Sequence, residues 1–478
     1  MILLLISKTW AIQPPPKQLS LKDVSYTLYK KKLYFSAMTY AIDYANSVGT
    51  VDPQFKVFLE ELISKTGTEL LSRTKNEILE KLSVKSIYLL IAKKYFLNKE
   101  YEQALKYLSF VPSDHRHYPE AQLTAGVIRM SSGEDNLALE NFKNCLKKSS
   151  GMSNNDPKIA RYYSMIKDNC QTNIGRLYYG QKKYDTAIKS FYEVDKKSYM
   201  WPYVLLEKGW AEYYKGNYNR SLGLISTYNA PLLDTYFQPE VELLKSLSYF
   251  KLCLWGDSLK VVDRYTENYK VRSEELKSIL VSNINSEDYF FKLILEHIQK
   301  RNNQNSFMKN LLTQIQKRTK FNLDLNAYLR AMNELTILKK AKPTPFIQNL
   351  IKNLEVDTAV LKSTVNFFVK EYFYNFINEI NSLSYQLFNL KLNVLSMQRN
   401  LEFKNEVLTT DRTRAQTKIE RNSTEMYWSF KQEFWADELG DFVFNLPSRC
   451  NVSKRELEKE AVATPVKAIV PKIKKEGR

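Results

Sequence analysis

Small and aromatic residues recur at fixed positions in the first half of this chain. In one segment they occupy offsets 0, 3, 9, 12 and 16, namely Gly175, Tyr178, Tyr184, Ala187 and Phe191. A second segment opens at Gly209, 34 residues later. This spacing predicts two short antiparallel helices per segment, packed closely where a small residue lets the backbones approach. Residues 173–225 therefore predict two successive helix pairs.

The same frame extends in both directions. Small residues open further segments at Ser25, Ala92, Gly126 and Ser246. Three prolines each lie seven residues before the small residue of their segment, namely Pro119, Pro202 and Pro239. A first helix begins there, and proline is best tolerated in the first turn of a helix. The period resembles that of the tetratricopeptide repeat (TPR), which is 34 residues. We count five repeats and one more at Ser25. Whether residues 46–82 form a degenerate repeat stays open.

The repeat frame has one insertion and one end. Gly126 and Gly175 are 49 residues apart, 15 more than the period, and the helical pattern after Pro157 predicts a lengthened first helix. Beyond residue 275 the helical spacing continues without the 34-residue period. Residues 276–345 therefore predict two or three helices that cover the apolar end of the array.

A second apolar pattern follows Pro343 and Pro345. Its members alternate spacings of four and three, namely Val369, Phe373, Phe376, Ile380, Leu383, Leu387, Leu390, Val394, Met397 and Leu401. This heptad seam predicts a long helix over about residues 344–404, within a coiled-coil helix or helical hairpin at 346–425. The apolar seam at 369–401 must be covered by another helix, but the pattern does not identify that helix. It predicts either packing on the chain's own helices or association with a second copy or a partner's helix.

A compact aromatic element follows. Residues 427–444 hold seven aromatic side chains together with Glu433, Asp437, Glu438 and Asp441. The element predicts a docked end of the chain, with a helix broken at Gly440 and a short strand at 441–444.

The element at 427–442 and repeats such as 201–222 together resemble the adventurous-gliding-motility TPR proteins of gliding and predatory bacteria. The resemblance implies a periplasmic scaffold within a trans-envelope machine.

Together these patterns predict an all-α protein: a TPR-like α-solenoid followed by a long coiled-coil helix and a small C-terminal aromatic element. The predicted divisions are residues 1–11 as a signal-peptide remnant, 12–19 as a Pro-rich spacer, 20–275 as the solenoid, 276–345 as the helical cap, 346–425 as the coiled-coil helix or hairpin, 426–450 as the aromatic element and 451–478 as a disordered basic tail.

The net charge of +19 indicates a lysine-rich solvated surface, or a face that meets an acidic polymer or membrane. The sequence carries no nucleic-acid-binding motif. It also has no apolar run of about 18 residues. We therefore expect protein partners, no nucleic acid, and at most peripheral contact with a membrane or cell wall. The apolar start favours the periplasm or cell envelope, with the cytoplasm as the alternative.

No catalytic, cofactor or metal signature is present. The sequence has no GxSxG and no phosphate-cradling glycine loop. His115 and His117 lack a third ligand at a metal-binding spacing, which predicts an ordinary surface loop. The preferred disulfide joins Cys145 to Cys170 across the insertion, and Cys253 with Cys450 would be the remainder. Four reduced, buried cysteines are the alternative.

The predicted function is binding. By resemblance to TPR stacks, the groove is lined by positions one and four after each small residue. These are Lys93, Phe96, Val127, Met130, Arg176, Tyr179, Trp210 and Tyr213, with Tyr214 beside them. Such a groove suits an extended peptide or an amphipathic helix with acidic groups, although several of these residues could instead pack between repeats. Three hypotheses stay open: an exported scaffold, a cytoplasmic TPR adaptor or chaperone, and a wall-associated enzyme or lytic regulator using the carboxylates at 427–442.

Overall fold

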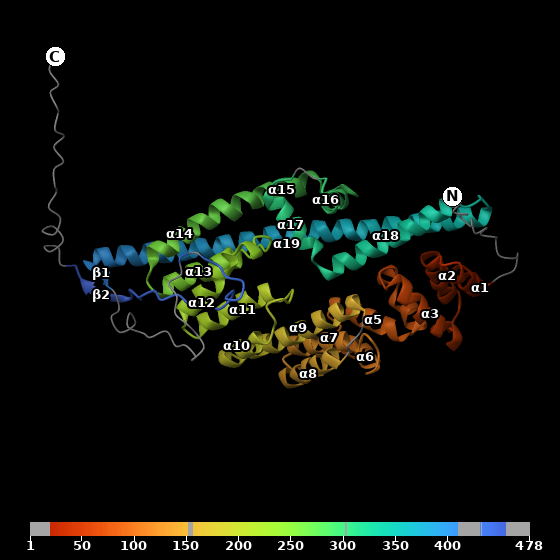
Figure 1. Ribbon diagram of the computed structural model, residues 1–478, viewed down its shortest axis with the longest axis horizontal. Helices are drawn as coiled ribbons and strands as arrows, with labels where there is room; N and C mark the ends of the chain where they lie inside the picture. Colours follow the sequence, from red (N-terminus) through yellow and green to blue (C-terminus); the bar gives the residue numbers. More distant parts are fainter. Residues whose placement is uncertain (1–19, 152–155, 302–303, 410–430, 432, 456–478) are drawn as a thin grey trace, which may run out of the picture.

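The computed structural model describes residues 20–151, 156–301, 304–409, 431 and 433–455 (Figure 1). Within these ranges the protein is all-α apart from one two-stranded sheet, so the predicted fold class is confirmed. No helix in these ranges combines the length and the apolar character that a membrane span requires. The predicted signal remnant at 1–11 and Pro-rich spacer at 12–19 lie outside the described residues.

Helix pairs follow the predicted repeat frame. They are α1 (Leu21–Lys30) with α2 (Tyr34–Ser47), α5 (Lys85–Leu97) with α6 (Tyr101–Ser109), α7 (Tyr118–Ser131) with α8 (Asp135–Gly151), α9 (Pro157–Gly180) with α10 (Tyr184–Tyr192), α11 (Trp201–Tyr214) with α12 (Tyr218–Ser226), and α13 (Glu240–Lys251) with α14 (Trp255–Tyr265). The degenerate segment holds α3 (Pro53–Thr66) and the short α4 (Asn76–Leu82). The insertion lengthens α9 to 24 residues.

The small residue of each pair is the contact point between its two helices. A Cβ added at Gly126 would overlap the ring of Phe142, and one added at Gly175 would overlap the ring of Phe191. At Ser246 the hydroxyl instead donates to the carbonyl of Ser258, at 3.0 Å. The small residue therefore contacts the residue 16 or 12 positions later, on the second helix of its pair. This contact explains the spacing of small and aromatic residues within each repeat.

Two disulfides tie segments of the chain together. Cys145 on α8 is bonded to Cys170 on α9, with their Cα atoms 6.2 Å apart. Cys253, two residues before α14, is bonded to Cys450 near the C-terminal end of the described chain. The first bond closes the inserted loop, and the second anchors a distant segment to the last repeat.

The cap contains more helices than the sequence predicted. It comprises α15 (Val271–Ser282), α16 (Tyr289–Ile298), α17 (Ser306–Gln316) and α18 (Thr319–Lys340). After it, α19 (Pro345–Phe403) is a single helix of 59 residues, which matches the expected start and end of the long helix. Figure 1 shows α19 running along most of the length of the molecule, with α18 beside its first half.

The heptad seam of α19 is covered by the chain itself. Its residues from Val369 to Val394 are buried, whereas Met397 is exposed. The first half of α19 contacts α2 and α18 and shares one hydrophobic cluster with α1 to α5, and the seam packs with helices from α13 to α18. The chain's own helices therefore cover the seam from Val369 to Val394, which is the first of the two partners that the pattern left open.

Polar contacts fix α18 and α19 against both ends of the solenoid. At the start of α2, the carboxylate of Glu334 on α18 accepts the backbone N–H groups of Phe35 and Ser36, at 2.9 and 2.8 Å. At the other end, the hydroxyl of Tyr265 donates to the carbonyl of Ile380 on α19, at 2.9 Å. The carboxylate caps buried N–H groups that have no partner within the helix, at a helix start where negative charge is favoured.

The segments after α19 differ from the prediction. The helix ends at Phe403, and β1 (Glu406–Thr409) pairs antiparallel with β2 (Asn451–Lys454), so neither a helical hairpin from 404 nor disorder at 451–455 is correct. The strand expected at 441–444 is also wrong, because residues 441–450 have no regular secondary structure. Residues 410–430 and 456–478 lie outside the described residues.

Residues 433–450, which we call the C-terminal strap, instead bind along the last repeats. The backbone N–H of Phe444 donates to the carbonyl of Asn219, at 3.0 Å, and the N–H of Leu446 donates to the Asn219 side chain, at 2.9 Å. Leu439 is buried in a cluster with Trp201 and Leu205. Asn219 on α12 thus accepts two backbone N–H groups of the strap, as a neighbouring strand would in a sheet.

We predict that Gly175→Ala destabilises the solenoid by about 1–3 kcal/mol, because its methyl group would overlap the Phe191 ring. Gly180→Ala on the same helix is the matched control, since a Cβ there meets nothing within 4 Å. Urea unfolding followed by circular dichroism measures both. Equal stability of the two variants would contradict the proposed contact.

Gly223→Ala is predicted to release the C-terminal strap while the helices stay folded. A Cβ at Gly223 would overlap the carbonyl of Phe442, which is backbone and cannot simply rotate away. Limited proteolysis should cut residues 433–450 faster in this variant, with unchanged helical circular dichroism. Gly256→Ala on α14 is the control, because its Cβ would meet open space.

Candidate functional site

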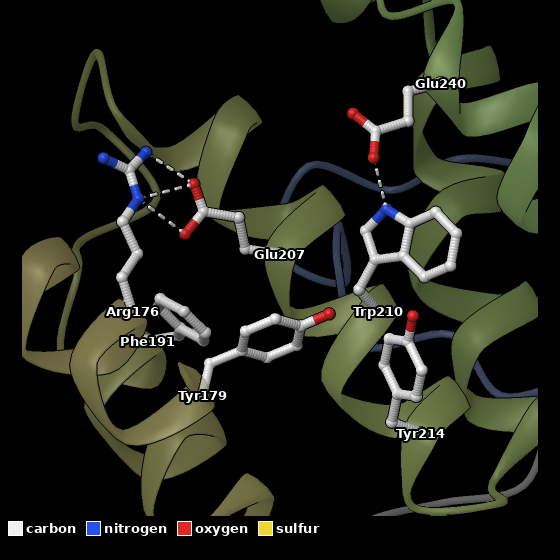
Figure 2. Close-up of a pocket in the computed structure, with 7 residues that line it drawn as sticks. All are labelled: Arg176, Tyr179, Phe191, Glu207, Trp210, Tyr214 and Glu240. Carbon is white, nitrogen blue, oxygen red and sulfur yellow. Dashed lines mark hydrogen bonds and ion pairs between the residues drawn. The ribbon is translucent and has the colours of Figure 1, made fainter. Parts of the chain in front are cut away.

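A pocket of about 330 Å³ opens between the repeats of Gly175 and Gly209. It is lined by Arg176, Tyr179, Phe191, Glu207, Trp210, Tyr214 and Glu240 (Figure 2). These residues come from α9, α10, α11 and α13. Four of the predicted groove residues therefore meet at one place: Arg176, Tyr179, Trp210 and Tyr214.

One side of the pocket is an ion pair between neighbouring first helices. The Nε of Arg176 donates to both carboxylate oxygens of Glu207, at 3.0 Å each, and its Nη2 donates to Oε1 at 2.6 Å. Such a forked arrangement is the strong geometry for an arginine–carboxylate pair. The pair fixes both side chains and neutralises the arginine charge.

The opposite side joins Trp210 to the next repeat. The indole N–H of Trp210 donates to Oε1 of Glu240, at 2.7 Å. Glu240 is the first residue of α13, directly after Pro239, and a helix start favours a carboxylate there. Burial raises the pKa of Glu240, while the hydrogen bond from Trp210 opposes that shift.

Aromatic rings form the wall between these two sides. The Tyr214 ring is stacked on Trp210 at 5.9 Å and on Tyr184 at 5.8 Å, and Tyr179 meets it edge-on at 6.0 Å. Tyr214 is nevertheless 55% exposed. In Figure 2 the Tyr179 hydroxyl points toward the Trp210 indole across the pocket. The rings therefore brace one another and still present surface to a ligand.

Tyr213 belongs to the packing beside the pocket. Its ring contacts Trp210 and Tyr218, at 5.6 and 5.4 Å, and it is only partly exposed. Burial raises the pKa of Tyr213 to about 12. The structure therefore places Tyr213 behind Trp210, and Tyr214 is the more exposed of the two tyrosines.

The remaining predicted groove residues lie away from this pocket. Phe96 packs beside Tyr101, with ring centres 6.0 Å apart, and Val127 and Met130 pack against the core of the Gly126 repeat. Lys93 forms an ion pair with Glu120, at 2.5 Å. Arg176, Tyr179, Trp210 and Tyr214 thus line the described pocket, while these other predicted groove residues have their contacts elsewhere.

The histidine loop is part of a polar cluster. His115 Nε2 lies 3.2 Å from the Glu60 carboxylate, and His117 Nδ1 lies 3.7 Å from Glu120. The Tyr162 hydroxyl also donates to Glu120, at 2.6 Å. Burial disfavours the charged Glu120 carboxyl, but these partners and Lys93 hold its pKa below the usual range. The predicted loop is present as a turn in which residues 113, 114 and 116 are exposed, while both histidines are partly buried.

No group of three or more metal-ligating side chains gathers anywhere in the described ranges. Two of the carboxylates at 427–442 have structural contacts. Asp441 pairs with Lys196 at 2.5 Å, and Glu433 accepts the backbone N–H of Lys431 at 2.9 Å. Asp441 therefore helps to hold the C-terminal strap on the solenoid.

Sequence reasoning missed Glu207 and Glu240. Glu207 could have been found, because residues 207, 210 and 214 share one face of a helix. Glu240 carries no such signal, since it belongs to the next repeat and lies six residues before that repeat's small residue. Both missed residues are acidic, and both change the charge of the site.

Comparison with known proteins gives no family. No family model matches the chain, and no curated protein matches it. Among solved structures, the apo form of RapI has a TM-score of 0.37 at 12% identity, covering 71% of this chain and 96% of that one. The Rap conjugation gene regulator of plasmid pLS20, solved with the Phr* peptide, has a TM-score of 0.30 at 11% identity, covering 71% and 94%. Similarity this low carries no argument about function.

Proposed function

We propose that this protein is a non-enzymatic interaction scaffold that holds a partner peptide in the pocket between the repeats of Gly175 and Gly209. The observation that carries the proposal is a cluster of aromatic and charged side chains, held in place by their own contacts, with exposed surface at Tyr214. Tryptophan, tyrosine and arginine are the side chains that most often dominate binding energy at protein interfaces.

The surrounding structure suits this role because the pocket is preorganised. Arg176 is fixed by Glu207, and Trp210 is fixed by Glu240. A ligand therefore meets side chains whose conformations are already restricted, and less entropy is lost on binding. The volume lies at the lower end of the range for ligand pockets, about 300–1,000 Å³, which fits one or two peptide side chains.

We further propose that the scaffold works in the bacterial cell envelope, within an assembly of the gliding-motility type. The resemblance of residues 427–442 to the gliding-motility TPR proteins motivates this location. All four cysteines are bonded in two disulfides, and disulfides persist in oxidising compartments. The cytoplasmic adaptor remains the alternative location for the same binding role.

The peptide pocket predicts that Tyr214→Ala weakens binding of a selected peptide at least tenfold, equivalent to about 1.4 kcal/mol. Peptides are selected from a random display library on the full chain, and their affinities are measured by fluorescence polarisation. Tyr385→Ala is the control, because that tyrosine is 68% exposed on α19, outside the pocket lining. Equal affinity for the Tyr214→Ala variant, or no selected peptide at all, would contradict the proposal.

The envelope location predicts that the protein contains no free thiol in its native cells. Intact cells are treated with a membrane-permeable alkylating reagent, and the denatured protein is weighed by mass spectrometry before and after reduction. We expect no alkyl group before reduction and four cysteines that react after it. Alkylation of all four without reduction would favour the cytoplasmic alternative.

A further inference from the structure

We propose that the pocket binds a cationic side chain, a lysine or arginine of the partner peptide, between Glu240 and the rings of Trp210, Tyr214 and Tyr179. This inference rests on the proposed peptide-binding function and specifies its ligand. It reverses the expectation of acidic partner groups, which came from the presence of Lys93 and Arg176 in the predicted groove.

Both of those cations are already neutralised within the chain. Lys93 pairs with Glu120 at 2.5 Å, outside the pocket, and Arg176 is held by Glu207 in a forked pair. Neither is positioned to attract a carboxylate from a partner. An acidic ligand entering the pocket would meet the carboxylate of Glu240, and like charges repel strongly where water is excluded.

Glu240 supplies the charge that remains. Within the described part of the chain, no lysine, arginine or histidine forms an ion pair with it. Its printed hydrogen bond comes from the neutral indole of Trp210. The pocket is therefore locally acidic in a protein of net charge +19.

The aromatic wall suits the same ligand. A lysine ammonium or arginine guanidinium is attracted to the face of a Trp or Tyr ring when it lies within about 6 Å of the ring centre. Such contacts already occur in this protein, since the Lys208 ammonium lies 3.4 Å from the Tyr192 ring centre and the Lys317 ammonium lies 4.3 Å from that of Tyr236. The aliphatic stem of lysine or arginine would also cover the rings.

A purely apolar ligand fits less well. It would remove water from the Glu240 carboxylate without providing a partner for its charge, and a buried unpaired charge is costly. A cation at the same position both pairs with the carboxylate and contacts the rings. The arrangement of one carboxylate beside several ring faces therefore selects for positive charge rather than for hydrophobic character alone.

The test uses peptides selected on the full chain by display. We expect them to share a lysine or arginine, and replacing that residue by norleucine should weaken binding to the wild-type protein about tenfold. Glu240→Gln should produce a similar loss for the lysine peptide, yet change the affinity of the norleucine peptide less than twofold. Glutamine retains an acceptor for the Trp210 N–H, and Glu371→Gln on an exposed part of α19 is the matched control.

The possible failures are distinguishable. If no peptide is selected, the proposed function falls and this inference falls with it. If peptides bind in a Tyr214-dependent way without a lysine or arginine preference, the inference alone is overturned. A preference that persists unchanged in Glu240→Gln overturns it as well. The norleucine comparison on the wild-type protein needs no variant, so it decides the question even if Glu240→Gln fails to fold.

Discussion

The close approach of two helices at a residue with little or no side chain is the constraint on which this array depends. The Phe142 ring occupies the space that a side chain at Gly126 would need, and Phe191 does the same at Gly175. Each contact fixes how the first helix of a pair is rotated about its axis. The positions just after the small residue are fixed with it, and in the Gly175 repeat these are Arg176 and Tyr179. The pocket is thus a consequence of how tightly the helices pack.

The long helix adds a second level of organisation. An ordinary solenoid has contacts only between neighbouring repeats. Here α18 and α19 pack with the first helices at one end and with α13 to α17 at the other. Glu334 caps α2, and Ile380 accepts a hydrogen bond from Tyr265, so residues far apart in the sequence are tied through one element. The heptad seam that suggested a coiled coil serves this internal role.

Much of this architecture follows from sequence patterns that act over short distances. The small residues, the prolines at helix starts and the heptad spacing each describe one helix or one pair, and these elements are correctly predicted. The sequence could not predict the partner of α19, because a seam requires burial without specifying what covers it. Nor could it predict that Asn219 would bind residues 444–446 through its backbone carbonyl and its side-chain amide, since these contacts replace the pairing a strand pattern implies.

Part of the site could be predicted because it follows from the same short-range repeat pattern. Arg176, Tyr179, Trp210 and Tyr214 share a position within their repeats, so the repeat frame identifies them. The charge of the pocket depends instead on Glu207 and Glu240, whose roles arise between repeats. Counting cations along the groove led to acidic ligands. The ion pairs show that neither Lys93 nor Arg176 is an unpaired cation in the folded chain.

The bracing by α19 has a mechanical consequence. Helical-repeat arrays with free ends behave as springs, since small rotations between neighbours add up to large changes in pitch. Because α19 is attached near both ends of the array, it removes most of that freedom. The disulfide between Cys253 and Cys450 fastens the C-terminal strap to the last repeat. The molecule would then resist stretching along α19.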